Sequence, residues 1–239
     1  MPDAPQAQKQ SPETVTIRAL PMNILKDQGV IWTSPFHIKV GDLKVVLPLL
    51  AATGVAISTD RYTSRDVVSH DPGFNNANTD LSNVMIGGML VTPAILFGVG
   101  QFGNNEHARE TGLLGAEAIA DGVVVEQGMK LIFWRERPNQ GDGHGRFFQS
   151  SAGIDSSFPS SHAELAWATA AVLAGEYRSP WLQATVYTGA TAISLARILG
   201  QDHFPSDVLV GATTGWLVGH YVYKHRHRWK PAKHSDMSR

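Results

Sequence analysis

Apolar segments of helical length recur six times along this chain, separated by polar stretches rich in glycine, asparagine, serine and aspartate. Their length and their alanine, leucine and glycine content favour helices over strands. The six segments are 43–58, 81–103, 112–134, 163–177, 181–199 and 207–223. The pattern predicts an all-α fold of about six core helices, with polar loops over 61–80 and 139–158.

The composition sets the outer limits of the fold and of its partners. The 239 residues are enough for one domain with a sizeable core. A formal net charge of −1 gives no electrostatic case for nucleic acid, and the absence of cysteine excludes disulfides and thiol catalysis. We expect a polar extension over 1–40, disordered to about residue 20 and without a signal-peptide pattern. The core domain is expected over 41–223 and a basic tail over 224–239.

A first cluster places two cations near the end of a predicted helix. Lys130 and Arg137 lie seven residues apart, about two helical turns, so both should project from one face. Pro138 should stop the helix at or near Arg137. Glu126 precedes Lys130 by four residues and is placed to pair with it. Alone, these charges fit a solvated helix face equally well.

A second cluster lies at a predicted helix start. Ser161 is expected to be the N-cap, and Glu164 completes a capping box with it. Ser160 and His162 flank this helix N-terminus, whose unpaired N–H groups attract anions. Ordinary helix capping explains this cluster better than a binding site does when the cluster is taken alone.

A third cluster adds a histidine with a carboxylate near it. Pro205 suits the first turn of a helix, His203 precedes it, and Asp207 follows His203 by four residues. A carboxylate near a ring nitrogen fixes the tautomer and leaves the other nitrogen free to attack. Arg197 closes the preceding predicted helix. The loop around His203 is polar, which weakens the alternative of a buried structural histidine.

Together the three clusters resemble the type 2 phosphatidic acid phosphatase (PAP2) family, which shares its fold and site with bacterial class A acid phosphatases and vanadium haloperoxidases. The family pattern is Lys-x6-Arg-Pro, then Pro-Ser-Gly-His, then Ser-Arg-x5-His-x3-Asp. This chain matches every spacing over about 116–223. It departs at Ser161, where the family has glycine, and at Ala196, where the family has serine.

The resemblance implies a phosphatase with a covalent intermediate. His203 would attack phosphorus and form a phosphohistidine, Asp207 would orient His203, and His162 would protonate the leaving group and then activate water. The phosphate oxygens are expected against Lys130, Arg137, Ser160, Ser161 and Arg197. The cations Lys130, Arg137 and Arg197 make a catalytic metal unnecessary. No cofactor is therefore expected, and vanadate should inhibit the enzyme.

The chemistry of the substrate stays open at this stage. A phosphorylated lipid such as phosphatidic acid or an isoprenyl diphosphate is the first expectation, and a soluble acid phosphatase acting on small phosphate esters is the alternative. A haloperoxidase with vanadate as its cofactor, or a binder of phosphorylated ligands without turnover, ranks lower. The sequence carries no signal for an oligomeric state.

Membrane integration is predicted from one long apolar segment and from the placement of basic residues. The stretch 81–105 carries no charge, and a span needs about 20 residues. The helix ends away from the predicted site carry Lys39, Lys44, Arg178 and the basic tail. This placement fits an inner-membrane protein of bacterial type with cytoplasmic termini and an outward-facing site. A soluble periplasmic enzyme is the alternative, since 112–134 carries four charges.

Overall fold

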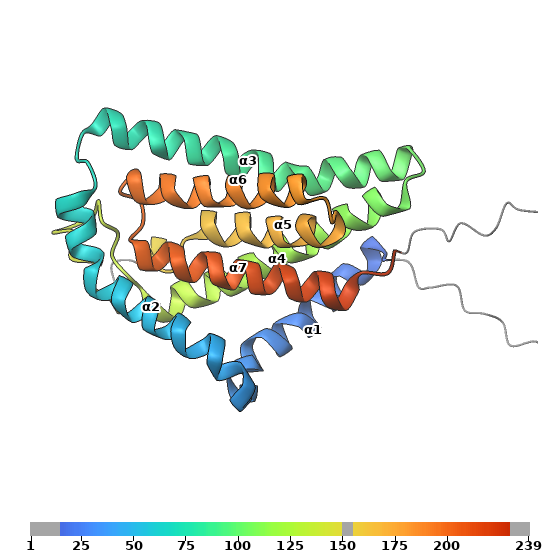
Figure 1. The fold of residues 1–239 in the computed structure, drawn as a ribbon, viewed down its shortest axis with the longest axis horizontal. Coiled ribbons are helices and arrows are strands. Elements are labelled where there is room, and N and C mark those ends of the chain that lie inside the picture. The colour runs from blue at the N-terminus through green and yellow to red at the C-terminus, as the bar shows by residue number, and fades with distance from the viewer. Residues whose placement is uncertain (1–14, 150–154, 230–239) are drawn as a thin grey trace, which may run out of the picture.

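The computed structural model describes residues 15–149 and 155–229, and these residues form helices and loops without a strand (Figure 1). The expectation of an all-α fold is confirmed for this part of the chain. The helices are α1 (Leu20–Thr33), α2 (Leu43–Tyr62), α3 (Pro72–Phe102), α4 (Glu106–Phe133), α5 (Ser161–Glu176), α6 (Pro180–Leu199) and α7 (Pro205–Arg226).

Helix starts follow local capping chemistry. Asp71 caps α3 by accepting from the Phe74 N–H at 2.7 Å, and Asn105 caps α4 by accepting from the Ala108 N–H at 3.0 Å. Proline occupies the first position of α3, α6 and α7. The backbone N–H at this position has no partner within a helix, so its absence in proline costs no hydrogen bond.

Three boundaries differ from the prediction. Helix α1 lies within the expected polar extension and packs on α4; only residues 1–14 of that extension fall outside the described part. The expected loop 61–80 is mostly helical, because a π-turn over Thr63–Val67 continues α2 and the Asp71 cap starts α3 at Pro72. The expected C-terminal tail begins later than 224, because α7 continues to Arg226; its residues 230–239 lie outside the described part.

The centre of the molecule is the packing of α5 against α7 (Figure 1). Three glycines spaced four residues apart form one stripe on α7: Gly211, Gly215 and Gly219. A Cβ built on Gly215 would lie 2.0 Å from the Glu164 carbonyl oxygen, and one on Gly219 would lie 2.2 Å from that of Ala168. The two helices therefore approach more closely than any side chain on this stripe would allow.

Figure 1 also shows how the outer helices lie around this pair. Helices α3 and α6 run alongside α5, whereas α1 and α2 diverge from the bundle as two arms of a V. Ile86, Ala170 and Ile193 belong to the core cluster shared by α3, α5 and α6. Helices α5 and α7 both begin at the left end of this view, where α4 and α6 both end.

Two segments of the described chain are long and apolar enough to cross a membrane, Val40–Val67 and Pro72–Phe102. Both leave much of their apolar surface uncovered. On α2 the exposed side chains include Val45, Leu47, Leu50 and Val55, and on α3 they include Val84, Val91, Ile95 and Val99. Exposed apolar surface of this extent marks an interaction site, and a lipid bilayer is one partner that fits it.

Candidate active site

Lys130 lies on a helix and Arg137 lies in a loop. The expectation that both project from one helix face is therefore wrong. Helix α4 ends at Phe133, because Trp134 adopts the left-handed conformation at φ 37° and closes the last turn. Lys130 therefore lies on the last turn of α4, whereas Arg137 lies in the following loop. That loop is held by the Arg137 guanidinium itself, whose Nε donates to the Asp155 carbonyl at 3.1 Å.

Arg137 faces the predicted nucleophile. Its Nη1 lies 3.3 Å from Nε2 of His203 and 3.1 Å from the carbonyl oxygen of Asp202. His203 is buried in the loop between α6 and α7. A guanidinium can only donate hydrogen bonds. Nε2 of His203 must therefore be the acceptor in this contact, with its lone pair pointing toward Arg137.

The other ring nitrogen of His203 bonds to a backbone carbonyl, which revises the predicted role of Asp207. Nδ1 lies 2.8 Å from the Ser157 carbonyl oxygen, whereas its distance to Asp207 Oδ2 is 3.8 Å. A carbonyl accepts only, so Nδ1 carries the proton. The tautomer assigned by these partners is therefore set by Ser157 and Arg137, and Asp207 makes no direct hydrogen bond to the ring.

Asp207 is instead part of a buried ionic network that the sequence analysis missed. Its Oδ1 lies 2.5 Å from Nη1 of Arg135, and Nη2 of Arg135 lies 2.7 Å from Oδ2 of Asp60 on α2. The Arg135 guanidinium also lies over the rings of Phe147 and Phe204, at 4.5 and 4.3 Å from their centroids. This network ties α2, the loop after α4 and the start of α7 together beneath His203.

The serine cluster differs from the predicted capping box. Ser160, not Ser161, is the N-cap of α5, and it caps without a side-chain hydrogen bond. Ser161 accepts from Lys130 Nζ at 2.9 Å and donates to Glu126 at 2.5 Å. The predicted pairing of Glu126 with Lys130 is present at 2.8 Å. The hydroxyl that replaces the family glycine is thus fixed between a cation and a carboxylate.

Glu164 also departs from the capping-box expectation. Its side chain is buried, and neither carboxylate oxygen has a hydrogen-bond partner among the described residues. The Ser160 hydroxyl is likewise buried without a partner in the described chain. The start of α5 is therefore held by a backbone contact, in which the Ser160 N–H donates to the Asp207 carbonyl at 3.0 Å.

The third part of the site joins His162 and Arg197 through helix α3. Nε2 of His162 lies 2.9 Å from Oδ1 of Asn83, and Arg197 Nη1 lies 3.4 Å from the same oxygen. Arg197 also contacts Ser82 at 3.1 Å and Asp202 at 3.0 Å. Because an amide oxygen accepts, Nε2 of His162 is the donor here and Nδ1 is left for another partner.

One electrostatic consequence links the three parts of the site. Burial, and then the positive charges of Arg137, Arg197 and Lys130, hold the pKa of His203 well below its ordinary value of 6.5. The imidazole is therefore neutral at physiological pH. A neutral imidazole with a lone pair on Nε2 can act as a nucleophile, and the three cations can bind an anionic phosphate group. The site is therefore suited to attack on the phosphorus atom of a phosphate ester.

The sequence profile of the PAP2 superfamily matches residues 111–231. The chain belongs to this superfamily. All eight predicted site residues lie within the matched range, whereas Asp60, Ser82 and Asn83 lie before it. The PAP2 region thus depends on α2 and α3 to complete its site.

A lipid A 1-phosphatase from Porphyromonas gingivalis is 30% identical to this PAP2 protein over 203 residues. The match covers 79% of this chain and 40% of that protein, so the chain spans less than half the length of this relative. No solved structure gives a significant match to the chain.

Proposed function

We propose that this protein is a phosphatase that removes phosphate from a phosphorylated lipid through a phosphohistidine on His203. The observation that carries this proposal is the state of the His203 ring. Its Nδ1 is bonded to the Ser157 carbonyl, and its Nε2 lone pair faces Arg137. Membership of the PAP2 superfamily and the similarity to a lipid A 1-phosphatase support the reaction class.

The first chemical step forms a nitrogen–phosphorus bond and breaks a phosphorus–oxygen bond. When the phosphate binds, its oxygens accept the hydrogen bonds of Arg137 in place of Nε2 of His203. The freed Nε2 lone pair then attacks phosphorus. Burial, and then the positive charge of Arg197, lower the pKa of His162 to about 3 in the free site, so this ring takes up its proton together with the anionic substrate, whose charge offsets the cations. As imidazolium it gives that proton to the departing alkoxide and becomes neutral. Lys130, Arg137 and Arg197 compensate the charge on the non-bridging oxygens.

The second step returns the enzyme to its starting state. Neutral His162 takes a proton from water as the water oxygen attacks phosphorus, and the bond to His203 Nε2 breaks. His162 is then protonated again, and it releases this proton to solvent once inorganic phosphate has left the site. The fixed cations supply the charge compensation in both steps, so the proposal includes no metal-dependent step.

We also propose that the protein is integral to a membrane, with its active site at the outer face. The two apolar segments and their uncovered surfaces support this. Arg178 and Lys224 lie at the ends of α5 and α7 away from the site, as the positive-inside rule expects. Extraction tests the idea: the protein should resist alkaline carbonate and need detergent, and recovery as a monodisperse soluble protein would refute it.

The function is tested by phosphate release from a panel of substrates in mixed micelles. The panel should include lipid A, phosphatidic acid, an isoprenyl diphosphate and a water-soluble sugar phosphate. We expect lipid substrates to be preferred, with turnover that survives EDTA and is competitively inhibited by vanadate. Preference for the soluble ester would favour the acid-phosphatase alternative.

The nucleophile is tested in the same assay with a matched pair of variants. His203→Ala should abolish turnover and the trapping of an acid-labile, base-stable phosphoenzyme. His220→Ala changes an exposed histidine that stacks on Trp216 and should retain both. Full activity in His203→Ala would show that another group is the nucleophile.

A further inference from the structure

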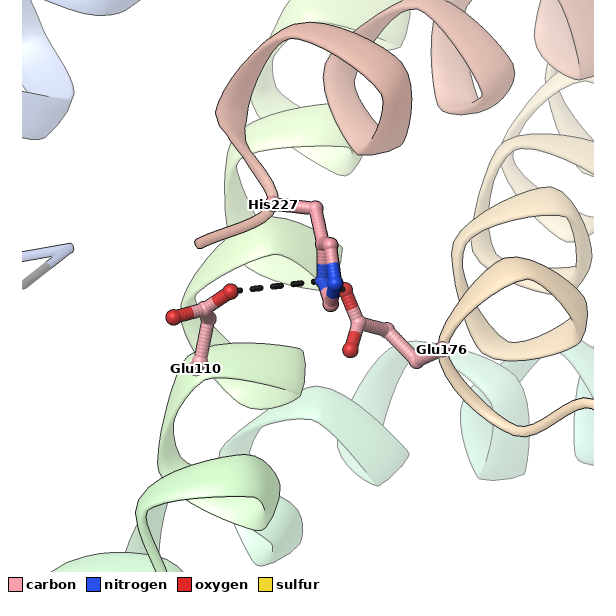
Figure 2. A group of neighbouring side chains, drawn as sticks. All are labelled: Glu110, Glu176 and His227. Carbon is pink, nitrogen blue, oxygen red and sulfur yellow. Dashed lines mark hydrogen bonds and ion pairs between the residues drawn. The ribbon is translucent and has the colours of Figure 1, made fainter. Parts of the chain in front are cut away.

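A second group of chemically reactive side chains lies at the end of the bundle away from the candidate active site. Glu110 comes from the start of α4, Glu176 from the end of α5 and His227 directly follows α7 (Figure 2). Helix α7 separates the two sites, and its 22 residues span about 33 Å. The basic tail expected over 224–239 includes His227, but in the structure this ring contacts both carboxylates.

Three atoms converge in this group. Nδ1 of His227 lies 2.7 Å from Oε1 of Glu176 and 3.4 Å from Oε1 of Glu110. Ligands bound about 2.1 Å from a tetrahedral metal ion lie about 3.4 Å apart. The Glu110 contact already has that separation, and the Glu176 contact reaches it with a shift of less than about 1 Å. Figure 2 shows both carboxylates on opposite sides of the imidazole ring.

Within residues 15–149 and 155–229, no lysine or arginine compensates the charge of this group. Both carboxylate side chains are buried, and within the described residues neither forms an ion pair with a lysine or arginine. Their only charged partners there are His227 and, for Glu176, His107 at 3.0 Å. With neutral histidines the group carries a charge of −2, which one divalent cation would cancel. Buried carboxylates are otherwise costly.

The surroundings hold these side chains in place as outer partners hold metal ligands. The backbone N–H groups of Arg228 and Trp229 donate to Oε1 of Glu110 at 2.6 and 2.8 Å, which fixes the orientation of the carboxylate that faces His227. His107 holds Oε2 of Glu176 and stacks on the Trp229 ring at 4.0 Å. His227 is half-buried, so an ion can reach the group from solvent.

We propose that Glu110, Glu176 and His227 form a binding site for a divalent first-row transition-metal ion that fastens the end of α7 to α4 and α5. Two carboxylates and one imidazole suit Zn²⁺ or Mn²⁺, with water completing the coordination. Mg²⁺ favours oxygen ligands alone and should bind poorly. The site is structural and separate from phosphate transfer.

A neighbouring carboxylate cluster serves as an internal comparison. Asp27, Glu117 and Asp121 also lie within ligand distance of one another. Arg226 pairs with both Asp27 and Glu117 there, so a guanidinium already occupies the place of a cation. This cluster also lacks an imidazole. It is therefore the weaker metal site, and its disruption should leave metal binding unchanged.

The proposal is tested by calorimetric titration of the full-length protein in detergent, without a histidine tag and after removal of metals with EDTA. At pH 7.5 we expect one Zn²⁺ per chain, weaker binding of Mn²⁺ and none of Mg²⁺. Zn²⁺ should also raise the thermal unfolding midpoint. Lowering the pH to 5.5 should weaken binding, because protons compete for the ligands.

Matched variants decide where the ion binds. His227→Ala and Glu110→Gln should each weaken Zn²⁺ binding by at least tenfold and remove the thermal shift. His225→Ala, which changes an exposed histidine two residues away, and Asp121→Asn should keep both. Absence of stoichiometric binding, or binding that survives His227→Ala, would overturn the proposal, as would loss of binding in Asp121→Asn. Phosphatase turnover is read separately and should persist in the metal-free protein.

Discussion

Replacing Asp207 by asparagine separates two ways in which this residue can assist His203. A carboxylate that alone fixes the tautomer of a catalytic histidine is worth about 10⁴-fold in turnover. Here the Ser157 carbonyl lies 2.8 Å from Nδ1, whereas Asp207 Oδ2 lies 3.8 Å away. We therefore expect the Asp207→Asn protein to keep the correct tautomer and to lose only the electrostatic contribution of the carboxylate.

The size of that contribution follows from the distances. Two unit charges 3.8 Å apart interact by about 4 kcal/mol at an effective dielectric constant of 20. Arg135 lies 2.5 Å from the other carboxylate oxygen and cancels much of this field at the ring. A remainder of about 1–3 kcal/mol corresponds to a loss of roughly 10- to 100-fold in turnover.

The variant also disturbs the buried network, so stability must be measured with activity. The Phe204 N–H and the Ser157 hydroxyl both donate to Oδ2 of Asp207, at 2.8 and 2.6 Å. An asparagine can keep an oxygen there only by turning its NH₂ group toward Arg135. Two donors then face each other, which should destabilise the fold by about 1–3 kcal/mol.

The assay is kcat on one lipid phosphate at saturation, compared with the thermal unfolding midpoint of the same preparation. Ser157→Ala is the matched control, because it removes the hydroxyl but keeps the carbonyl that holds Nδ1, and it should cost less than tenfold. A 10⁴-fold loss in folded Asp207→Asn protein would refute the argument and restore the carboxylate as the orienting group.

Three further outcomes follow from the same geometry. Because the pKa of His203 lies well below 6.5, the nucleophile gains a proton only as pH falls far below that value. The acid limb of kcat/KM should therefore lie below pH 6.5 with a substrate whose phosphate does not titrate there; a limb at higher pH would contradict this. His162→Ala should slow alkyl phosphates more than activated aryl phosphates, and equal losses would indicate a phosphate-binding role instead. Gly215→Ala should destabilise the fold by about 1–3 kcal/mol in thermal or chemical unfolding, since its Cβ would meet the Glu164 carbonyl at 2.0 Å; an unchanged midpoint would show that α5 and α7 can separate.

Much of the architecture is local and was therefore predictable. The apolar segments over 43–58, 163–177, 181–199 and 207–223 became α2, α5, α6 and α7 within a few residues, because helix period and proline placement depend on near neighbours. Helix α1 was missed because its sequence is only moderately apolar, and its asparagine, aspartate and glutamine looked like an extension. Those residues contact other helices instead: Asn23 donates to Glu117 of α4 at 3.1 Å, Gln28 donates to Asp121 of α4 at 2.8 Å, and Asp27 pairs with Arg226 of α7.

The motif spacings by themselves determined which charged residues and histidines reach the ends of α4, α5, α6 and α7. Each motif lies at or next to a helix end. The position of a helix end is set by the nearby sequence, so it can be predicted locally. The tertiary structure alone decided the partners of those groups. Asn83 meets His162 across 79 positions, and Asp60 meets Ser206 across 146. Such contacts depend on how closely whole helices pack, which no local pattern encodes.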